Sequence, residues 1–242
     1  MKTTIVIPTY NERENIGLLL DKIFTWLPEV FVLVVDDNSP DKTAEKVREC
    51  QKKFGNLSLL VREKKEGLGK AYIDAFSRVI KDGEVDKVVM MDADFSHDPE
   101  RLPTFLAAAA KSDVVVGSRY AEGGGTVGWE LWRRLLSRFG NFYARLITGM
   151  PLTDLTGGFN LMKADFLRKI NLKELDMSGY AFIMEIKSSL FIAGAKFCEV
   201  PIIFRNRREG ESKISSHIIR EGVIAPWKIR MKINKSRRLE NK

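Results

Sequence analysis

The sequence predicts an α/β protein built on a mostly parallel β-sheet that is flanked by helices. Over residues 1 to about 118, short apolar runs alternate with segments whose apolar residues recur at a helical period. This alternation is typical of successive βαβ units, which produce a parallel sheet. The first apolar run, residues 3–8, is nearly continuous in Ile and Val, as expected for a strand that is buried on both faces.

The elements of this first half follow one another in a regular order. Five strands are expected, at residues 3–8, 31–35, 57–61, 88–91 and 114–116. Helices are expected between them, at residues 15–27, around 44–50, from about 70 to 80, and at 102–110. The clearest helix is the first, because Ile16, Leu19 and Ile23 recur at helical spacing. Asp98 is expected to cap a helical turn that begins at Pro99.

After Gly117 the regular alternation stops. Helices are expected at residues 130–148 and 179–193, and one strand is expected at residues 197–204. Loops are expected at residues 123–125, 154–159 and 205–213. Arg133, Arg134 and Arg138 lie at helical spacing, which fits a solvated face and a functional face equally well.

The composition indicates a folded globular protein, because 44% of the residues are hydrophobic and 30% are charged. No run approaches the roughly 18 consecutive apolar residues that a membrane span needs. The N-terminus shows no signal-peptide pattern. Cys50 and Cys198 are expected to be small core residues of a cytoplasmic protein rather than a disulfide. With only His97 and His217 present, a histidine-rich metal site is excluded.

The net charge of +8 is concentrated at the C-terminal end of the chain. Residues 201–242 hold twelve Lys and Arg against four Asp and Glu, and the two signs balance in the rest of the chain. This asymmetry indicates an anionic partner at one end of the molecule.

Residues 214–232 interleave apolar and basic side chains, which predicts an amphipathic helix. That helix either packs on the core or lies at a membrane interface. Near an anionic membrane, each basic residue contributes about 1 kcal/mol of attraction. The apolar residues are Ile218, Ile219, Val223, Trp227, Ile229 and Met231, and the basic ones are Lys228, Arg230, Lys232, Lys235, Arg237 and Arg238.

Two carboxylates, Asp92 and Asp94, directly follow the apolar run at residues 88–91. Such a pair suits a divalent cation that also holds substrate phosphates, although an acid-rich turn has the same pattern. Polar clusters also follow two other strands, at residues 10–12 and 36–37. Because ligands of parallel sheets bind beyond the carboxyl ends of the strands, the agreement of three clusters favours a ligand site.

A glycine-rich stretch at residues 67–70, Gly-Leu-Gly-Lys, also invites comparison with phosphate-binding loops. It lacks the four-residue gap and the Ser or Thr of a P-loop, and it lacks the third glycine of a dinucleotide fingerprint. A turn followed by a helix start is therefore the better interpretation of these residues.

Together these motifs resemble the family 2 inverting glycosyltransferases of the GT-A fold. The resemblance rests on residues 7–12, residues 35–39 and the motif Asp92-Ala93-Asp94. Further motifs are similar to those of dolichol-phosphate mannosyltransferases within that family. They lie at residues 117–120, 128–129, 154–159 and 207–213.

The resemblance runs from residue 3 to about 215 and implies a Rossmann-like GT-A sheet with a C-terminal amphipathic helix. It implies one catalytic domain over residues 1–213, followed by a basic amphipathic tail over residues 214–242. Within the domain, residues 1–118 would bind the nucleotide sugar and residues 119–213 would form the acceptor side.

The resemblance also implies a role for each matching position. The residues lining the nucleotide pocket would be Pro8, Tyr10, Glu12, Val35 and Asp37. Asp92 and Asp94 would hold Mg²⁺ or Mn²⁺ on the donor diphosphate. Ala93 would adjoin the ribose, and Ser96 stands where relatives carry a third, amide-type ligand, which leaves the coordination there open. The residues contacting donor or acceptor phosphates would be Arg119, Arg207 and Lys213.

The activity implied by the resemblance is transfer of mannose from GDP-mannose to a dolichyl or polyprenyl phosphate, with inversion. The protein would work peripherally at the cytosolic face of a membrane, through its basic tail and with or without an integral-membrane partner. An acceptor phosphate is already ionised near pH 7, so a protein base is dispensable. Asp154 and Glu185, the remaining candidates for a base, are expected to have structural or acceptor-positioning roles.

Other functions stay open at this point. Within the same class, the donor is a UDP-sugar such as UDP-glucose, or the acceptor is a glycan hydroxyl. A regulator that binds a nucleotide sugar without turning it over fits the same pocket. A nucleic-acid-binding protein is disfavoured, because no binding motif is present and the acids at the strand ends would repel phosphates without a metal.

Overall fold

The computed structural model describes residues 2–206 and 216–240 of the chain. Its centre is a seven-stranded sheet in the order β3-β2-β1-β4-β7-β5-β8, in which only β7 runs against its neighbours. The predicted α/β fold with a mostly parallel sheet is confirmed. The strands are β1 (Lys2–Thr9), β2 (Phe31–Asp36), β3 (Leu57–Val61), β4 (Val85–Met90), β5 (Val114–Ser118), β7 (Asn160–Lys163) and β8 (Phe197–Pro201).

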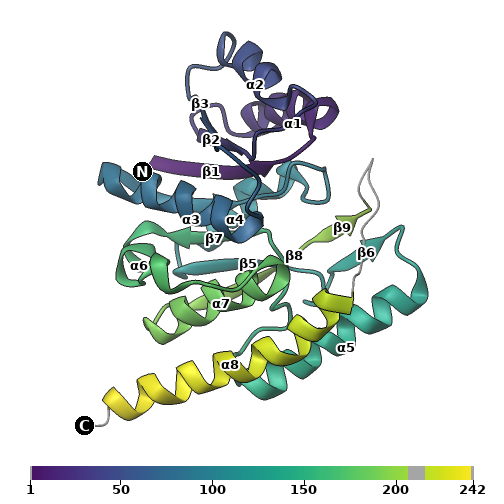
Figure 1. Ribbon diagram of the computed structural model, residues 1–242, viewed down its shortest axis with the longest axis vertical. Coiled ribbons are helices and arrows are strands. Elements are labelled where there is room, and N and C mark those ends of the chain that lie inside the picture. Colours follow the sequence, from purple (N-terminus) through teal and green to yellow (C-terminus); the bar gives the residue numbers. More distant parts are fainter. Residues whose placement is uncertain (1, 207–215, 241–242) are drawn as a thin grey trace.

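Helices cover both faces of this sheet (Figure 1). One face carries α1 (Arg13–Trp26), α2 (Thr43–Gln51) and α4 (Leu102–Ala108). The other carries α3 (Leu68–Val79), α6 (Ala164–Lys169) and α7 (Gly179–Ile192). Alternation along the strands supplies both layers, because Ile5 and Ile7 of β1 face the first layer and Val6 faces the second. The described residues also contain three short 3₁₀ turns, at Ile80–Asp82, Pro99–Arg101 and Leu172–Glu174.

The antiparallel strand β7 was not predicted from the sequence. It holds only Asn160, Leu161, Met162 and Lys163, which is too short a run for a periodic pattern. It lies between β4 and β5, so these two parallel strands are not neighbours. Because β7 is antiparallel to β4, it begins beside the carboxyl end of β4. The preceding loop, residues 154–159, therefore lies at this end, where Asp92 lies.

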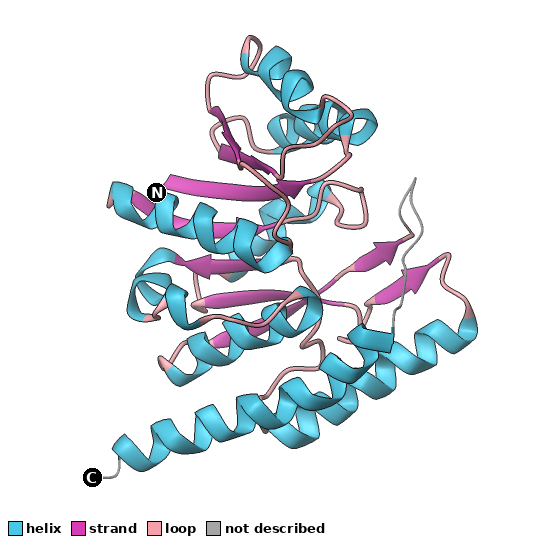
Figure 2. Cartoon of the chain, in the orientation of Figure 1, coloured by secondary structure: helices cyan, strands magenta, loops and turns pink. Residues whose placement is uncertain are grey.

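The predicted strand over residues 197–204 is in fact two strands in two different sheets. β8 ends at Pro201, and β9 (Ile203–Arg205) pairs with β6 (Gly125–Val127), which extends out of the predicted loop at residues 123–125. Proline has no N–H to donate to a sheet ladder, which suits Pro201 to the last position of β8. Figure 2 shows the β6–β9 pair, in magenta, set apart from the main sheet.

Two smaller predictions are confirmed. The Asp98 carboxylate accepts a hydrogen bond from the backbone N–H of Glu100, 3.1 Å away, and so caps the turn that begins at Pro99. Cys50 and Cys198 are free thiols, and both are partly buried against the core rather than within it. Within the described ranges, no helix is long and apolar enough to cross a membrane.

The C-terminal helix α8 (Ser216–Glu240) packs on the body of the protein, between α7 and α5 (Leu131–Thr148). Ala225, Ile229 and Ile233 are buried in the same core cluster as α3 and α7. The opposite face, with Val223, Trp227 and Met231, is exposed. The sequence left open whether this segment packs on the core or lies at a membrane interface. One face of α8 packs on the core. The proposed division of the chain at residues 118 and 213 stays a prediction.

Replacing Ile229 by Ala is expected to destabilise the protein by about 2–5 kcal/mol, because it leaves a cavity in the core. Met231→Ala, two residues away, removes a side chain that is 64% exposed instead of 0%, and is expected to have little effect. Urea unfolding of both variants measures the difference. Equal losses of stability would mean that α8 is not docked through its Ile229 face.

Candidate active site

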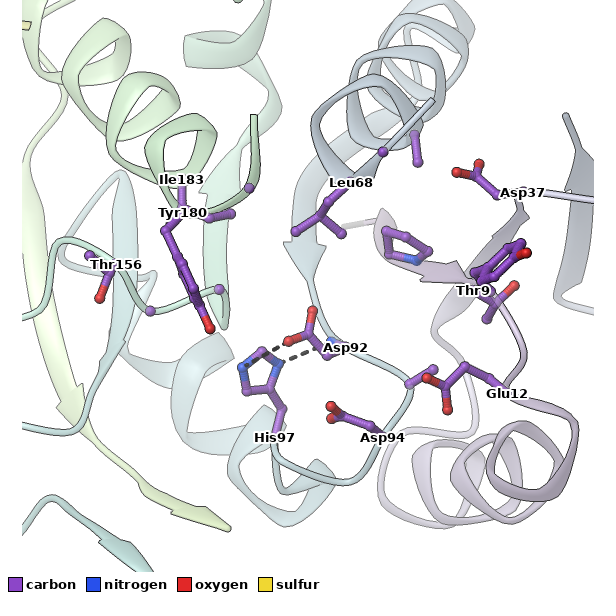
Figure 3. A pocket seen from close by; sticks show the side chains of 18 of the residues that line it. Thr9, Glu12, Asp37, Leu68, Asp92, Asp94, His97, Thr156, Tyr180 and Ile183 are labelled. Atoms are coloured by element: carbon purple, nitrogen blue, oxygen red, sulfur yellow. Dashed lines mark hydrogen bonds and ion pairs between the residues drawn. The ribbon is translucent and has the colours of Figure 1, made fainter. Parts of the chain in front are cut away.

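A cavity of about 440 Å³ opens at the carboxyl ends of β1, β2 and β4. In Figure 3, Asp92 and Asp94 lie between one wall that carries Glu12 and Asp37 and another that carries Tyr180. The predicted site residues that line the cavity are Pro8, Tyr10, Glu12, Asp37, Asp92, Ala93, Asp94 and Arg119. The segments that follow β1, β2 and β4 are far apart in the sequence but meet at this cavity. This agrees with the prediction that they lie at one edge of the sheet.

Two predicted site residues that the structure describes do not line the cavity. Val35 is fully buried in the hydrophobic core next to the end of β2. Ser96 is buried beside Asp94. Arg207 and Lys213 lie outside the described residues.

His97 fixes the position of Asp92, and sequence reasoning missed it. Its Nδ1 accepts a hydrogen bond of 3.0 Å from the Asp92 backbone N–H, and its Nε2 lies 3.7 Å from the Asp92 carboxylate (Figure 3). In the neutral ring the proton is therefore on Nε2, which faces that carboxylate. The ring is buried and stacked on Phe159, with centroids 5.0 Å apart. The one signal in the sequence is that His97 shares a short loop with Asp92 and Asp94.

The loop after Asp92 turns sharply at Phe95, whose φ of 62° lies in the left-handed region that β-carbon-bearing residues rarely occupy. This turn lets the Ser96 backbone N–H donate to the Asp94 carboxylate over 3.0 Å. The Ser96 Oγ is buried and has no hydrogen-bond partner in the described structure. A buried orphan oxygen beside a carboxylate is a position where a bound ion or water would be stabilised.

The residues present fit a hard divalent cation that shares its ligands with a substrate. No group of three or more His, Cys, Asp and Glu side chains among the described residues is arranged to hold a metal ion by itself. Asp92, Asp94 and the Ser96 Oγ form an all-oxygen set, which suits Mg²⁺ or Mn²⁺ rather than softer metals. Such ions usually complete their shell with phosphate oxygens and water.

Asp37 is held at the opposite wall by a buried arginine that sequence reasoning also missed. Arg62 Nη1 lies 2.6 Å from the Asp37 carboxylate, and the same guanidinium binds Asp74 at 2.8 Å and Glu66 at 3.1 Å. Burial opposes the Arg62 charge, but hydrogen bonds and the charges of Asp37 and Asp74 outweigh it and raise the pKa of Arg62. The side chain of neighbouring Asp36 is fully buried and accepts hydrogen bonds from Thr9 at the end of β1 and from Ser39 in its own turn.

Tyr10 offers an aromatic surface at the mouth of the cavity. Its ring is partly exposed and lies 3.6 Å from the Lys65 ammonium, measured to the ring centroid. A partly exposed tyrosine ring that lines the same cavity as the Asp37 carboxylate is suited to stacking against a flat heterocycle whose N–H groups donate to that carboxylate.

Two helices begin at the cavity and direct backbone N–H groups toward it. α3 begins after Gly67, whose φ of 95° is accessible to glycine, and Gly67 and Leu68 line the cavity. α7 begins with Gly179 and Tyr180, which line the opposite wall. The positive ends of both helix dipoles therefore favour an anionic ligand between them.

Arg119 lines the cavity at the end of β5 and is paired with a buried carboxylate. Its Nε and Nη2 donate to Asp154 over 2.7 and 2.8 Å, and its backbone N–H donates to the same carboxylate over 3.0 Å. Burial alone would raise the pKa of Asp154, but the charge and hydrogen bonds of Arg119 outweigh it and hold that pKa at about 2. The guanidinium also lies 5.6 Å from the rings of Trp129 and Phe204.

Lys187 of α7 is a fully buried lysine that organises the loop containing Asp154. Its Nζ donates to the backbone carbonyls of Asp154, Leu155 and Gly157 at 3.0, 3.4 and 3.0 Å. Burial lowers the pKa of Lys187 to about 8, against the opposing effect of the Asp154 charge. Sequence reasoning missed this residue, because a lysine within an apolar helix carries no signal of its partners.

Residues 4–170 match the family model described as glycosyl transferase family 2, which covers more than half of the chain. The chain belongs to glycosyl transferase family 2. It is a glycosyltransferase, as the motifs at the three strand ends predict.

Relatives within this family are similar over nearly the whole chain. An undecaprenyl-phosphate mannosyltransferase of Micrococcus luteus is 41% identical over 224 residues, which cover 93% of this chain and 92% of the relative. A polyprenol monophosphomannose synthase of Mycolicibacterium smegmatis is 39% identical over 241 residues, covering 98% and 90% of the two chains.

Solved structures support the GT-A-like fold. Glucosyl-3-phosphoglycerate synthase from Mycobacterium tuberculosis, crystallised with phosphoglyceric acid, superposes with a TM-score of 0.67 over 95% of this chain and 79% of that one. Its complex with Mn²⁺, UDP and glucosyl-3-phosphoglycerate superposes with a TM-score of 0.66. The sequences are only 17% and 18% identical, so this likeness concerns the fold.

Neither carboxylate that the sequence left as a possible base of this glycosyltransferase is placed for that task. Asp154 is occupied by Arg119 and the Gly157 N–H, and a pKa of about 2 makes it a weak base. Glu185 is fully buried in α7. It accepts hydrogen bonds from the backbone N–H groups of Asp176 and Met177 and lies 2.6 Å from Lys232 of α8. Both geometries favour structural roles.

The pKa of Asp154 predicts a loss of stability in acid. Its folded pKa, about 2, lies below the ordinary value of 3.8, so the stabilisation is present above pH 4 and is lost as the pH falls through about 2. The difference corresponds to about 2 kcal/mol. Asp154→Asn, which leaves Arg119 buried without its charge partner, is expected to cost about 3–5 kcal/mol at neutral pH. The difference in the free energy of unfolding between the wild-type protein and Asp154→Asn should become smaller between pH 4 and pH 2.

Urea unfolding across this pH range measures the effect. Asp21→Asn is the matched control, because Asp21 pairs with Lys53 on the surface, where both side chains are about half exposed or more. That substitution is expected to cost less than about 1 kcal/mol. A stability gap for Asp154→Asn that stays constant with pH would contradict the assigned pKa.

Proposed function

We propose that this glycosyltransferase transfers mannose from GDP-mannose to a polyprenyl (dolichyl-type) phosphate, with inversion at the sugar carbon and with Mg²⁺ or Mn²⁺. The observation that carries the proposal is one cavity with two carboxylates in its floor and Arg119 on its acceptor side. It occurs in a chain about 40% identical to relatives named for mannosyl transfer to polyprenyl phosphates.

The donor nucleotide occupies the wall formed by the ends of β1 and β2. Its base stacks near Tyr10, and N–H groups of the base donate hydrogen bonds to the Asp37 carboxylate. Arg62 holds this carboxylate in place. Asp92, Asp94 and Ser96 would hold the divalent cation, which when bound would supply positive charge beside the leaving diphosphate. His97 keeps the Asp92 carboxylate in position for this task.

The acceptor phosphate lies on the side of Arg119. Two donors of Arg119 are fixed by Asp154, and the Arg133 guanidinium is stacked 4.3 Å from the centroid of the Trp129 ring at the same wall. Arginine donors hold phosphate oxygens with defined geometry. Arg207 and Lys213 are part of this proposal as further phosphate contacts, although they lie outside the described residues.

Transfer is a single displacement. An ionised oxygen of the acceptor phosphate attacks the anomeric carbon of the sugar, and the bond from that carbon to the donor diphosphate breaks. The bonding electrons leave with the diphosphate, and the configuration at the carbon inverts. No proton moves in this step, which agrees with the absence of an available carboxylate base at Asp154 and Glu185 among the described residues.

We further propose that the protein acts peripherally at the cytosolic face of a membrane, where its lipid acceptor lies. The basic residues of α8 would be drawn to anionic lipids. An integral-membrane partner is a further candidate for contact with this helix.

Turnover assays with a panel of GDP- and UDP-sugars and a short polyprenyl phosphate test the proposal. GDP-mannose is expected to give transfer and to raise the melting temperature in the presence of Mn²⁺ or Mg²⁺, and EDTA is expected to remove both effects. Transfer from a UDP-sugar alone would replace the proposed donor. Donor binding that EDTA leaves unchanged would contradict the proposed metal role of Asp92 and Asp94.

Asp94→Asn is expected to lower turnover by about a hundredfold or more, because the cation loses a charged ligand. Asp98→Asn is the matched control in the same loop, since Asn replaces Asp well as a helix cap and Asp98 does not line the cavity. It is expected to keep nearly full turnover. A similar loss in both variants would indicate damage to the loop rather than loss of a ligand.

A further inference from the structure

The helix α5 has its large apolar side chains on the outside. Its buried residues are the small or polar Asn141, Ala144 and Thr148. Seven large apolar side chains of this 18-residue helix are exposed, six of them by more than half: Leu131, Trp132, Leu135, Leu136, Phe139, Phe142 and Leu146. A helix that packs on a core normally shows the opposite arrangement, so this face is made to contact something other than water.

The exposed apolar surface continues onto α8. The two helices lie side by side in Figure 1, α5 in teal and α8 in yellow. Tyr143 of α5 joins them, because its hydroxyl donates to the Val223 carbonyl over 3.1 Å and accepts from the Trp227 indole N–H over 2.8 Å. Val223, Trp227 and Met231 are exposed beside this contact. We name the exposed apolar residues of α5, together with these three of α8, the α5–α8 face.

The charges on these two helices are basic except for Glu221 and Glu240, which lie near the two ends of α8. Residues 131–148 and 222–239 contain no Asp or Glu. Their basic residues are Arg133, Arg134, Arg138, Arg145, Lys228, Arg230, Lys232, Lys235, Arg237 and Arg238. Aromatic and leucine side chains flanked by Arg and Lys are typical of helices that lie in a membrane interface.

We propose that the α5–α8 face inserts into the surface of an anionic lipid bilayer. A second copy of the chain is a poorer occupant, because a symmetric dimer would bring the same patch of each subunit together. Two strongly basic surfaces would then meet with few acidic groups to offset them, which is costly. An anionic bilayer supplies both the apolar interior and the opposite charge.

The α5–α8 face borders the cavity. Its insertion into a bilayer would therefore bring the cavity to the lipid acceptor, an inference that rests on the proposed function. α5 begins two residues after Trp129, which lines the cavity, and Arg133 of its first turn is stacked on the Trp129 ring. With the face in the bilayer, a lipid phosphate can reach Arg119 while its apolar chain stays in the membrane.

The inference differs from attraction through a basic tail in its dependence on salt. Purely electrostatic attachment is lost at high ionic strength, whereas burial of apolar side chains is not. Co-sedimentation with phosphatidylcholine vesicles containing phosphatidylglycerol, at low and high salt, is expected to show weakened but persistent binding in high salt. Complete release in high salt would overturn insertion of the face.

Trp132→Ser is expected to weaken vesicle binding about tenfold, because one large apolar side chain no longer enters the bilayer. Trp26→Ser is the matched control: Trp26 is 47% exposed against 55% for Trp132, but it lies on α1 at the opposite end of the molecule (Figure 1). Since the Trp132 indole N–H also bonds Glu130, Phe139→Ser provides a second test without a hydrogen bond. Equal binding by all these proteins would overturn the inference.

Two further measurements separate this inference from the proposed function. Turnover with a short, water-soluble polyprenyl phosphate should be unchanged in Trp132→Ser and Phe139→Ser. Turnover of this acceptor by a wild-type protein that does not bind vesicles would overturn insertion and keep the proposed function. Conversely, wild-type binding to vesicles that is lost in both variants, without turnover of any acceptor, would support insertion and overturn the proposed function. A wild-type dimer that Phe139→Ser dissociates, without vesicle binding, would assign the face to a second copy and overturn the inference.

Discussion

The buried ion pair between Arg119 and Asp154 connects five parts of the fold that lie far apart in the sequence. Arg119 follows β5, and Asp154 opens the loop that leads to β7. Around Asp154, Lys187 of α7 holds three carbonyls of this loop, Asn141 of α5 accepts from Leu155 and Thr156, and Glu199 of β8 accepts from Thr153 and Asp154. Two cationic and two anionic side chains balance one another there. Because buried charges are costly unless they are paired, the cluster tolerates few other arrangements of these elements.

This rigidity brings the loop close to the carboxylates of the floor. A β-carbon on Gly158 would lie 3.4 Å from the His97 ring and 3.8 Å from the Asp92 carboxylate, and one on Gly157 would lie 3.1 Å from the Gly117 carbonyl. Glycine therefore allows the loop to approach Asp92 without filling the cavity. The antiparallel strand β7, inserted next to β4, makes this approach possible, since a parallel strand there would carry the loop to the other end of the sheet.

The parts of the fold that the sequence predicted are those with a periodic signal. The parallel strands and α1 repeat apolar residues over enough positions to be recognised, and the acids at the strand ends then mark one edge of the sheet. β7 has four residues, and β6 and β9 have three each, so none carries a period. Arg62, His97 and Lys187 were missed because their partners are set by packing, which no spacing along the chain reveals. For α5, periodicity identifies an apolar face but does not say whether that face points inward or outward.

The balance of charge in the cavity connects the membrane inference to the proposed chemistry. In the proposed complex, two carboxylates would offset the divalent cation, and Asp154 offsets Arg119, so neither group would supply an unopposed positive charge. A donor diphosphate and an acceptor phosphate in one cavity nevertheless repel each other, and a water-poor site strengthens that repulsion. Arg133 differs from Arg119, because its polar contact within the described structure is to the Asn206 side chain and it belongs to an acid-free helix. We infer that the basic character of α5 serves two purposes, since the charge that attracts an anionic bilayer also offsets the phosphate that the bilayer presents.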